Sequence, residues 1–449
     1  MAERLPSAPW SASVPSTLPR RIGLITATSV VVANMIGTGI FTTTGFMLAR
    51  TESGWLVLLA WLLGGLVALC GALSYAELTT MMPHAGGEYV YLRQIYGPLP
   101  AFLTGWTSFF VGFSAPVAAS AVACAKYLAA AGLIHTTWLA EKSTAAGLVL
   151  VLTAVHYCGV RLGAHVQNLL TGLKLVLLFA LVAVGFAVGR GNWDFLSGTS
   201  EFWARGRPEQ LGLTMILAMF AYSGWNAAGY IGEEVEEPAR NLPRALLLGT
   251  LLVMVIYLLV NLLFFFAALP AQLSGVATVA EVAAVQLFGP GAAVKISALI
   301  GLGLLSSLSA YVLIGPRVYY AMARDGLFFR FASRIHPRFH TPGLSIVAQG
   351  ACSVVMILTG TFEQLLTYIG FALGIFPCMA VAGVILLRQR EPGRERPYRV
   401  WGYPSVPLFF LFVMLTALGV GLINSPKPSL IAIATVAAGV PVYWLTVRR

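Results

Sequence analysis

Two glycine-containing segments have residue types that could expose backbone groups for binding. The first is Ala33–Phe41 (ANMIGTGIF) and the second is Phe220–Gly229 (FAYSGWNAAG). Each interrupts a long apolar run, and glycine destabilises a helix interior by about 1 kcal/mol and permits unwound backbone. Free N–H groups at a helix start suit a carboxylate, and free carbonyls at a helix end suit an ammonium. The two segments therefore predict a site for a molecule that carries both charges.

A lysine inside an apolar run is the second candidate for chemistry. Lys174 lies about ten residues past Ala164, roughly 15 Å along a helix at 1.5 Å per residue. Its side chain cannot reach a membrane surface from that depth, so we expect a cavity, carbonyls or polar partners around it. Ionisable groups at such depth indicate function. Lys126 and Lys295 lie near the ends of their runs, from which a lysine reaches the interface.

The composition places these candidates in a membrane protein. Apolar residues make up 58% of the 449 residues and charged residues only 10%, against about 25% in soluble globular chains. This excludes soluble enzymes, nucleic-acid binders and disordered scaffolds. We predict an all-α protein, with a disordered tail at 1–20 and one transmembrane domain at 21–449. Its twelve predicted spans are 23–48 (broken), 55–78, 100–130, 144–160, 165–189, 210–233 (broken), 244–268, 290–320, 343–361, 363–387, 405–423 and 428–446.

The interrupted spans are the first and the sixth, five spans apart. Matched interruptions of this kind are typical of inverted-repeat transporters whose binding site lies at mid-membrane. We predict repeats at about 21–190 and 208–388, followed by two appended helices at about 404–446. The alternative is that the glycines only permit close packing of helices, as small residues often do in membranes.

The basic residues predict the orientation. Nineteen of the 28 Lys and Arg residues lie on the side of the two termini and six on the other, so we expect cytoplasmic termini. The basic residues on the cytoplasmic side thus account for the net charge of +11, and no nucleic-acid partner is needed to explain it. The five cysteines all lie in predicted spans, which indicates neither a disulfide framework nor a metal site. No glycosylation acceptor occurs, which favours a prokaryotic inner membrane.

Four motifs in the same order carry a family resemblance. They are Gly37–Phe41 (GTGIF), Pro83–Tyr91 (PHAGGEYVY), Gly224–Asn226 followed by Glu233–Arg244, and Arg317–Gly326. With them the chain resembles the amino acid–polyamine–organocation superfamily, most closely its L-amino acid transporter branch and the bacterial permeases near it. The resemblance covers nearly the whole chain. It implies a leucine-transporter-like fold with a 5+5 inverted repeat and discontinuous helices 1 and 6.

The resemblance also implies a set of substrate-binding residues. Thr38, where relatives commonly carry serine, and Gly39 would contact the carboxylate. Backbone carbonyls near the breaks, at Met35, Ile36, Phe220 and Ser223, would contact the ammonium. We expect Tyr222 and Trp225 to form a gate and a pocket wall. Asn226 would either bind the substrate or satisfy the broken helix.

The same resemblance suggests a role for Lys174. In relatives that work without sodium, a lysine in span 5 occupies the place that sodium takes in sodium-coupled members of the fold. We expect its ammonium to bridge span 1 to span 8, where Ser306, Ser307 and Ser309 supply oxygens. A purely structural hydrogen bond is the alternative. We expect the glutamates near cytoplasmic helix ends to be solvated, with an inner-gate latch as the alternative: Glu77, Glu88, Glu233, Glu234, Glu236 and Glu237.

These inferences predict sodium-independent transport of L-amino acids by alternating access, as an exchanger or a proton symporter. Neutral substrates are favoured because no Asp or Glu is expected at mid-span depth. We expect no enzyme activity, cofactor, metal or nucleic-acid partner. Residues 132–143 contain no cysteine, so no disulfide-linked subunit is expected. The main alternative is a membrane sensor that binds amino acids without moving them; a channel and a membrane enzyme fit the sequence less well.

Overall fold

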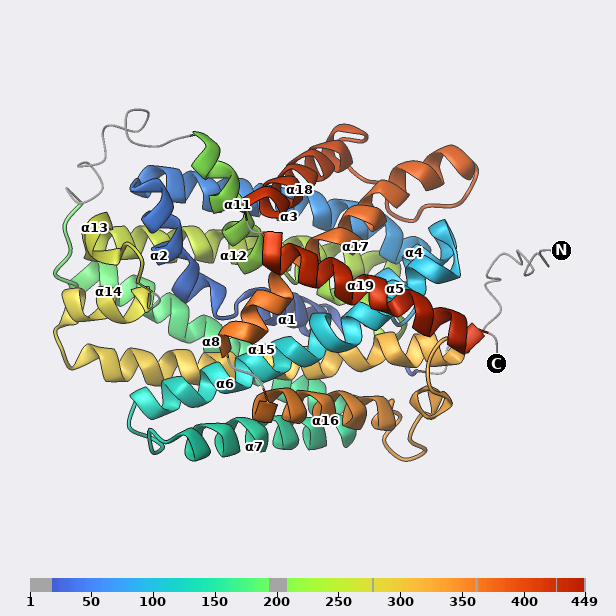
Figure 1. Ribbon diagram of the computed structural model, residues 1–449, viewed down its shortest axis with the longest axis horizontal. Coiled ribbons are helices and arrows are strands. Elements are labelled where there is room, and N and C mark those ends of the chain that lie inside the picture. The colour runs from blue at the N-terminus through green and yellow to red at the C-terminus, as the bar shows by residue number, and fades with distance from the viewer. Residues whose placement is uncertain (1–17, 194–207, 277, 360–361, 425, 448–449) are drawn as a thin grey trace.

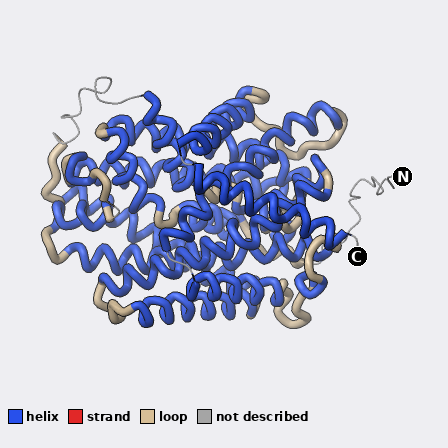
Figure 2. Tube along the Cα trace, in the orientation of Figure 1, coloured by secondary structure: helices blue, strands red, loops and turns tan. Residues whose placement is uncertain are grey.

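The computed structural model is a bundle of helices, and it describes residues 18–193, 208–276, 278–359, 362–424 and 426–447. Most of the long helices run roughly along the long axis of the bundle (Figure 1). Loops and turns gather mainly at its two ends (Figure 2). In the described part of the chain, eight helices are long and apolar enough to cross a membrane. The all-helical membrane fold is therefore confirmed.

The first half of the chain holds eight α-helices and one π-helical segment among its described residues. They are α1 (Leu24–Met35), α2 (Gly39–Thr51), α3 (Gly54–Met81), α4 (Glu88–Tyr96), α5 (Pro98–Thr107), η1 (Ser108–Ser114), α6 (Ala115–Ala130), α7 (Trp138–Tyr157) and α8 (Val160–Val188). η1 is the π-helical segment, and it joins α5 to α6 without a break. Such bulges leave the regular backbone ladder and are frequent at functional sites.

The second half begins with the broken helix and ends with two helices at the C-terminus. Its elements are α11 (Pro208–Tyr222), η2 (Ala227–Tyr230), η3 (Gly232–Glu234), α12 (Pro238–Ala267), α13 (Pro270–Leu273), α14 (Val279–Phe288), α15 (Ala292–Arg324), η4 (Arg330–Ser333), α16 (Gly343–Thr359), α17 (Phe362–Arg390), α18 (Ser405–Asn424) and α19 (Pro426–Val447).

The predicted spans coincide with these helices, although several ends differ. The largest shifts are at the starts of α7 and α12, which begin at Trp138 and Pro238 where the prediction begins at 144 and 244. The short helices α4, α13 and α14 were expected as loops. They do not interrupt a span, so hydropathy alone carries no signal for them. Residues 1–17 of the predicted tail lie outside the described residues, whereas Leu18 is buried beside Ala85 and Tyr320.

Helices from the two halves pack against each other in pairs. α3 packs on α12, α6 on α15, α7 on α16, and α2 on α11. The α7–α16 pair forms one edge of the bundle (Figure 1). α1 lies inside and contacts α12, α8 and α15, so its half from Val30 to Met35 is buried. This arrangement places the breaks of both helices in the interior, where unwound backbone is tolerated.

Backbone hydrogen bonds join the segment that follows the second break to two other segments of the chain. The N–H groups of Arg21 and Ile22 both donate to the carbonyl of Glu234 at 2.9 Å. The N–H of Gly86 donates to the carbonyl of Tyr230 at 3.1 Å. These contacts hold the N-terminal segment and the α3–α4 loop against the η2–η3 region, which closes this end of the bundle.

Candidate functional site

Both predicted helix interruptions are present and lie against each other. α1 ends at Met35 and α2 begins at Gly39, while α11 ends at Tyr222 and the chain resumes as η2 at Ala227. A side-chain carbon at Gly39 would lie 2.9 Å from the Cα of Ala221. Real side-chain carbons do not approach backbone this closely, so the contact between the broken helices requires glycine at this position.

The second break has its own glycine requirement. Gly224 has φ +99°, in the region that only glycine adopts readily. A side-chain carbon there would lie 2.8 Å from the Cβ of Asn34, in the last turn of α1. By contrast, a side-chain carbon at Gly37 would meet nothing within 4 Å. The glycines that suggested the site thus serve different purposes: Gly39 and Gly224 allow close contact, and Gly37 leaves open space.

A cavity of about 400 Å³ lies between the two breaks. Ligand sites for small molecules commonly measure about 300–1,000 Å³. Residues of both breaks line this cavity: Asn34, Met35, Gly37, Thr38, Gly39, Phe220, Ala221, Ser223, Gly224, Trp225, Asn226 and Ala227. Arg50, near the C-terminal end of α2, also lines it. The cavity therefore has room for a molecule of amino acid size and extends toward the end of the bundle that holds Arg50.

The backbone around this cavity presents opposite partial charges. The first turn of α2 starts at Gly39. The N–H of Phe41 donates to the carbonyl of Thr38 at 3.1 Å, whereas the N–H groups of Gly39 and Ile40 have no acceptor within the helix. With the positive end of the helix dipole they favour an anion there. Carbonyls at the end of α1 and at the end of α11 line the same space and favour a cation. The carbonyl of Phe220 already accepts two hydrogen bonds from Ser223, from its hydroxyl at 2.7 Å and from its backbone N–H at 3.2 Å.

A buried tyrosine that the sequence analysis did not single out joins the two breaks. The hydroxyl of Tyr257, on α12, lies 2.6 Å from the carbonyl oxygen of Met35 and 2.9 Å from that of Ala221. Its side chain is fully buried. Tyr257 therefore fixes the spacing between the end of α1 and the end of α11, and it occupies part of the acceptor capacity of Met35.

Two of the predicted substrate residues do not line the cavity. The carbonyl of Ile36 instead accepts hydrogen bonds from Lys174 and Ser307. Tyr222 is fully buried, and its hydroxyl donates to the carbonyl of Trp61 at 2.9 Å. Its side chain packs against Trp61 of α3, and its role as a gate or pocket wall stays a prediction. The other seven line the cavity, and their contacts with substrate stay predictions: Met35, Thr38, Gly39, Phe220, Ser223, Trp225 and Asn226.

Lys174 makes the predicted connection between the first and eighth spans. Its Nζ donates to the carbonyl of Ile36 at 2.6 Å and to the hydroxyl of Ser307 at 2.8 Å, and the side chain is 3% exposed. Ser307 also donates to the Ile36 carbonyl at 2.8 Å. The ammonium thus holds the unwound part of the first span against α15.

The neighbouring serines have other partners. Ser306 lies 3.0 Å from the hydroxyl of Thr171, and Ser309 lies 2.9 Å from Nε2 of His156. Of the three serines predicted around the ammonium, only Ser307 contacts it. Consecutive helical residues point in different directions, so a row of serines on one helix cannot all face one atom.

Comparisons with known proteins agree with this geometry. The amino acid permease family model matches residues 22–445. The b(0,+)-type amino acid transporter 1 of Mus musculus is 30% identical over 96% of this chain and 89% of its own length. The Asc-type amino acid transporter 1 of the same species is 30% identical over 96% of this chain and 82% of its own length. The serine/threonine exchanger SteT of Bacillus subtilis is 32% identical over 96% of this chain and 98% of its own length.

The chain belongs to the amino acid permease family. Its predicted function as a membrane transporter of amino acids is confirmed, and the family members are transporters rather than enzymes. The cavity between the breaks is thus the candidate substrate site of this permease, and Lys174 lies directly behind it on the side of α1.

The expectation of solvated glutamates is wrong for four residues of this permease. Glu77, Glu88, Glu233 and Glu234 are each at most 5% exposed. Their burial arises from partners distant in sequence, so a helix-end position alone did not reveal it. Only Glu236 and Glu237 lie exposed as expected.

Three of these buried acids are paired with arginines. Glu234 binds Arg317 with N–O distances of 2.7 and 3.1 Å, and both side chains are almost fully buried. Glu233 lies 3.3 Å from Arg324. These pairs join the segment after the second break to the C-terminal half of α15. They close the permease on the side of the cavity opposite Arg50.

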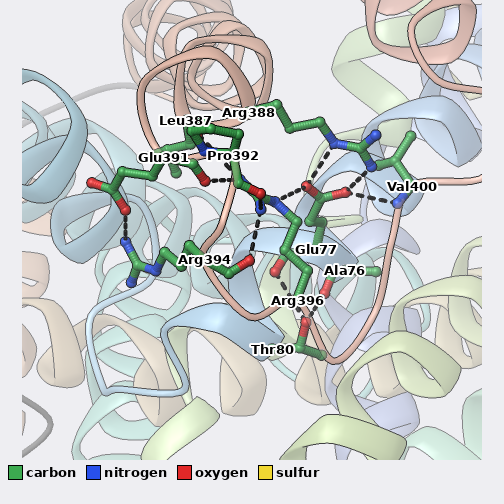
Figure 3. Close-up of polar contacts among 10 residues, drawn as sticks. All are labelled: Ala76, Glu77, Thr80, Leu387, Arg388, Glu391, Pro392, Arg394, Arg396 and Val400. Atoms are coloured by element: carbon green, nitrogen blue, oxygen red, sulfur yellow. Dashed lines mark hydrogen bonds and ion pairs between the residues drawn. The ribbon is translucent and has the colours of Figure 1, made fainter.

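Glu77, near the end of α3, is the centre of the third cluster (Figure 3). Arg388, near the end of α17, donates to its two oxygens at 3.0 and 2.5 Å. Arg396 lies 3.2 Å away, and the N–H of Val400 donates at 2.7 Å. One carboxylate therefore binds α3 to both α17 and the segment that leads into α18.

Several cavity residues were not predicted from the sequence. Ser108, Gly112 and Phe113 belong to the π-helical segment η1, and Tyr311 belongs to α15. The hydroxyl of Tyr311 donates to the carbonyl of Asn34 at 3.2 Å. Glu88 lines the same cavity although it lies in the loop region between the second and third spans. The positive-φ pair Gly86–Gly87, which directly precedes α4, was visible in the sequence as part of a motif.

Proposed function

We propose that this permease moves neutral L-amino acids without sodium, by alternating access of the cavity between the two broken helices. One observation carries the proposal: the start of α2 and the ends of α1 and α11 line one cavity. A zwitterion matches this arrangement, with its carboxylate at Thr38 and Gly39 and its ammonium at the carbonyls of Met35, Phe220 and Ser223. Discontinuous helices with this polarity are the usual binding element of transporters.

Lys174 supports the sodium-independent mode. Its buried ammonium holds the carbonyl of Ile36 and the hydroxyl of Ser307. A bound cation between the same two elements would need similar oxygen ligands, so the lysine supplies a positive charge in its place. We infer that Lys174 is the coupling element of the cycle and that sodium is not required.

Paired helix packing supports a 5+5 inverted repeat with twelve spans. The pairs α3–α12, α6–α15, α7–α16 and α2–α11 each join helices five predicted spans apart. Two repeats related by a pseudo-two-fold axis produce this pattern. In the proposal the repeats are residues 21–190 and 208–388, and the helices at about 404–446 stand outside them.

The remaining expectations concern the surroundings of the protein. The excess of Arg and Lys on one side favours cytoplasmic termini, and the lack of a glycosylation acceptor favours a prokaryotic inner membrane. The closed end of the bundle, with its Glu234–Arg317 pair, would then be cytoplasmic. Because residues 132–143 lack cysteine, no disulfide-linked subunit is part of the proposal.

The names of the relatives bear on which substrates this permease moves and on whether it exchanges them. One relative is named an exchanger of serine and threonine, and two are named transporters of the b(0,+) and Asc types. The lining of the cavity is largely apolar, with Phe113, Phe220 and Trp225 beside the hydroxyls of Thr38 and Ser108. Small neutral amino acids fit this lining best.

Reconstitution in liposomes tests the proposal. Vesicles preloaded with one unlabelled amino acid at a time, from a panel of twenty, would receive labelled serine in sodium or in choline buffer. We expect uptake stimulated by internal neutral amino acids and equal in the two buffers. An absolute requirement for sodium would contradict the proposal. Saturable binding without uptake would instead identify a sensor.

A further inference from the structure

Glu88 is a buried acid in the wall of the substrate cavity. It is the first residue of α4, it is 5% exposed, and it lines the same cavity as Asn226 and Trp225. No role in substrate binding or coupling was expected for it from the sequence. Its position at the cavity, on the side of the closed end, makes its charge state relevant to transport.

The hydrogen-bond partners of Glu88 are all neutral. Its Oε1 accepts from the hydroxyl of Tyr75 at 2.7 Å and from the amide nitrogen of Asn226 at 2.6 Å. Tyr230 of η2 provides a third hydrogen bond. The other buried acids at this end, Glu77 and the two of η3, are paired with arginines. Glu88 thus differs from its neighbours in the kind of partner it has.

Titratable groups that face Glu88 come from α3, α4 itself, η2 and α17. They are Tyr75 of α3, Tyr91 of α4 itself, Tyr230 of η2 and Cys378 of α17. In the described part of the chain, no cation contributes to the shift of its pKa. Burial raises the pKa of the Glu88 carboxyl above its ordinary value, against the opposing effect of its three hydrogen bonds. An unpaired buried carboxylate is costly, and binding a proton removes that cost.

Two contacts connect this carboxyl to the substrate site. Asn226, which donates to Glu88, belongs to the unwound segment between α11 and η2. Tyr75, the other donor, packs its ring against Trp225 with centroids 4.7 Å apart. A change in the charge of Glu88 therefore acts on both residues that form this part of the cavity wall.

We propose that Glu88 is a proton-binding site of this permease and that the loaded carrier reorients only when a proton occupies it. The proposal rests on the transport function proposed above and adds a ligand, the proton, to the same cavity. A neutral Glu88 fits the closed end seen in the structure. Loss of the proton leaves a carboxylate with no cation beside it, which disfavours this closed arrangement and with it the completion of the cycle.

The test measures the pH dependence of exchange in liposomes that have the same pH on both sides, using serine as substrate. Wild-type initial rates should fall with rising pH, by about tenfold per pH unit above a single midpoint. Glu88→Gln, which is uncharged at every pH, should transport at a rate that is independent of pH. Glu395→Gln is the matched control, because Glu395 lies exposed in the loop after α17. It should keep the wild-type profile.

Tyr75→Phe provides a second readout that does not depend on an active Gln variant. It removes a hydrogen bond that favours the charged form of Glu88, so the midpoint should move to higher pH. Size-exclusion chromatography establishes that each variant is folded. An unmoved midpoint in Tyr75→Phe, or a wild-type profile in Glu88→Gln, would overturn the proposal.

Two further outcomes separate this proposal from others. If wild-type protein exchanges serine equally at all pH values, the transport function stands and the proton site fails. If no amino acid is taken up at any pH, the transport function itself fails. Glu88→Gln that loses only lysine and arginine uptake, with an unchanged pH profile for serine, would assign the carboxylate to a cationic substrate side chain and overturn the proton site.

Discussion

Replacement of Lys174 by methionine tests whether the ammonium couples the broken helix to α15. Methionine keeps most of the length of the side chain but removes the bonds to Ile36 and Ser307. Hydrogen bonds to charged groups contribute about 1.5–3 kcal/mol each, so the two together contribute at least about 3 kcal/mol. At 1.4 kcal/mol per factor of ten, the loss corresponds to roughly a 100-fold slower transport step.

The same substitution should leave the protein folded. Removing a buried charge also removes the cost of its desolvation, and an apolar residue of similar size at a buried ionic site is often neutral for stability. The remaining hydrogen bond from Ser307 to the Ile36 carbonyl, at 2.8 Å, still satisfies that carbonyl. We therefore expect a transport defect without a matching loss of thermal stability.

The assay compares initial exchange rates of wild type, Lys174→Met and Lys295→Met in sodium and in choline buffers. Lys295 is an exposed lysine near the start of α15 and serves as the control. We expect the roughly 100-fold decrease only for Lys174→Met, in both buffers. A Lys174→Met rate equal to the wild-type rate would refute the coupling role, because the ammonium would then be a structural hydrogen-bond donor only.

Two further predictions concern the breaks and the closed end. Gly39→Ala should destabilise the contact with α11 and abolish transport, because its methyl group would collide with Ala221. Gly37→Ala should fold normally, because its methyl group meets no protein atom, and should weaken binding of the larger substrates by filling part of the cavity. Thermal melting and substrate competition distinguish the two variants. Glu234→Gln should lower the free energy of unfolding by about 3–5 kcal/mol, because Arg317 is left as an uncompensated buried charge. Glu237→Gln, at an exposed pair, should change it by less than about 1 kcal/mol.

The membrane spans could be predicted because lipid imposes a local rule on sequence. Backbone groups in the bilayer must be satisfied within the segment, so each span is a long apolar run. The interruptions at Gly37–Gly39 and Ser223–Asn226 were predictable for the same reason, since glycines within such runs need an explanation. The depth of Lys174 also followed from counting along one helix. Each of these features follows from residues that are close together in the sequence, so the sequence alone predicts it.

The glutamates could not be predicted in this way. Glu77 and Glu234 occur near helix ends, where solvated acids are common, and nothing nearby in sequence distinguishes them from the exposed Glu236. Their environments come from arginines 83 or more positions away, such as Arg317 for Glu234 and Arg388 for Glu77. Ion pairs across the bundle depend on which helices pack together, so they cannot be predicted from the sequence before the helix packing is known.

The binding site itself divides along the same line. Its backbone groups, the N–H groups at the start of α2 and the carbonyls beside them, were predicted, because glycines within apolar runs indicate a helix break. Its side-chain lining comes partly from the breaks themselves, with Thr38, Phe220 and Trp225, and partly from neighbouring helices, with Tyr311 from α15 and Glu88 from α4. Because the backbone groups recognise groups that every amino acid has, they cannot discriminate among substrates. Selectivity must therefore come from the side chains around the cavity, and those contributed by Tyr311 and Glu88 are recognisable only once the helices are packed.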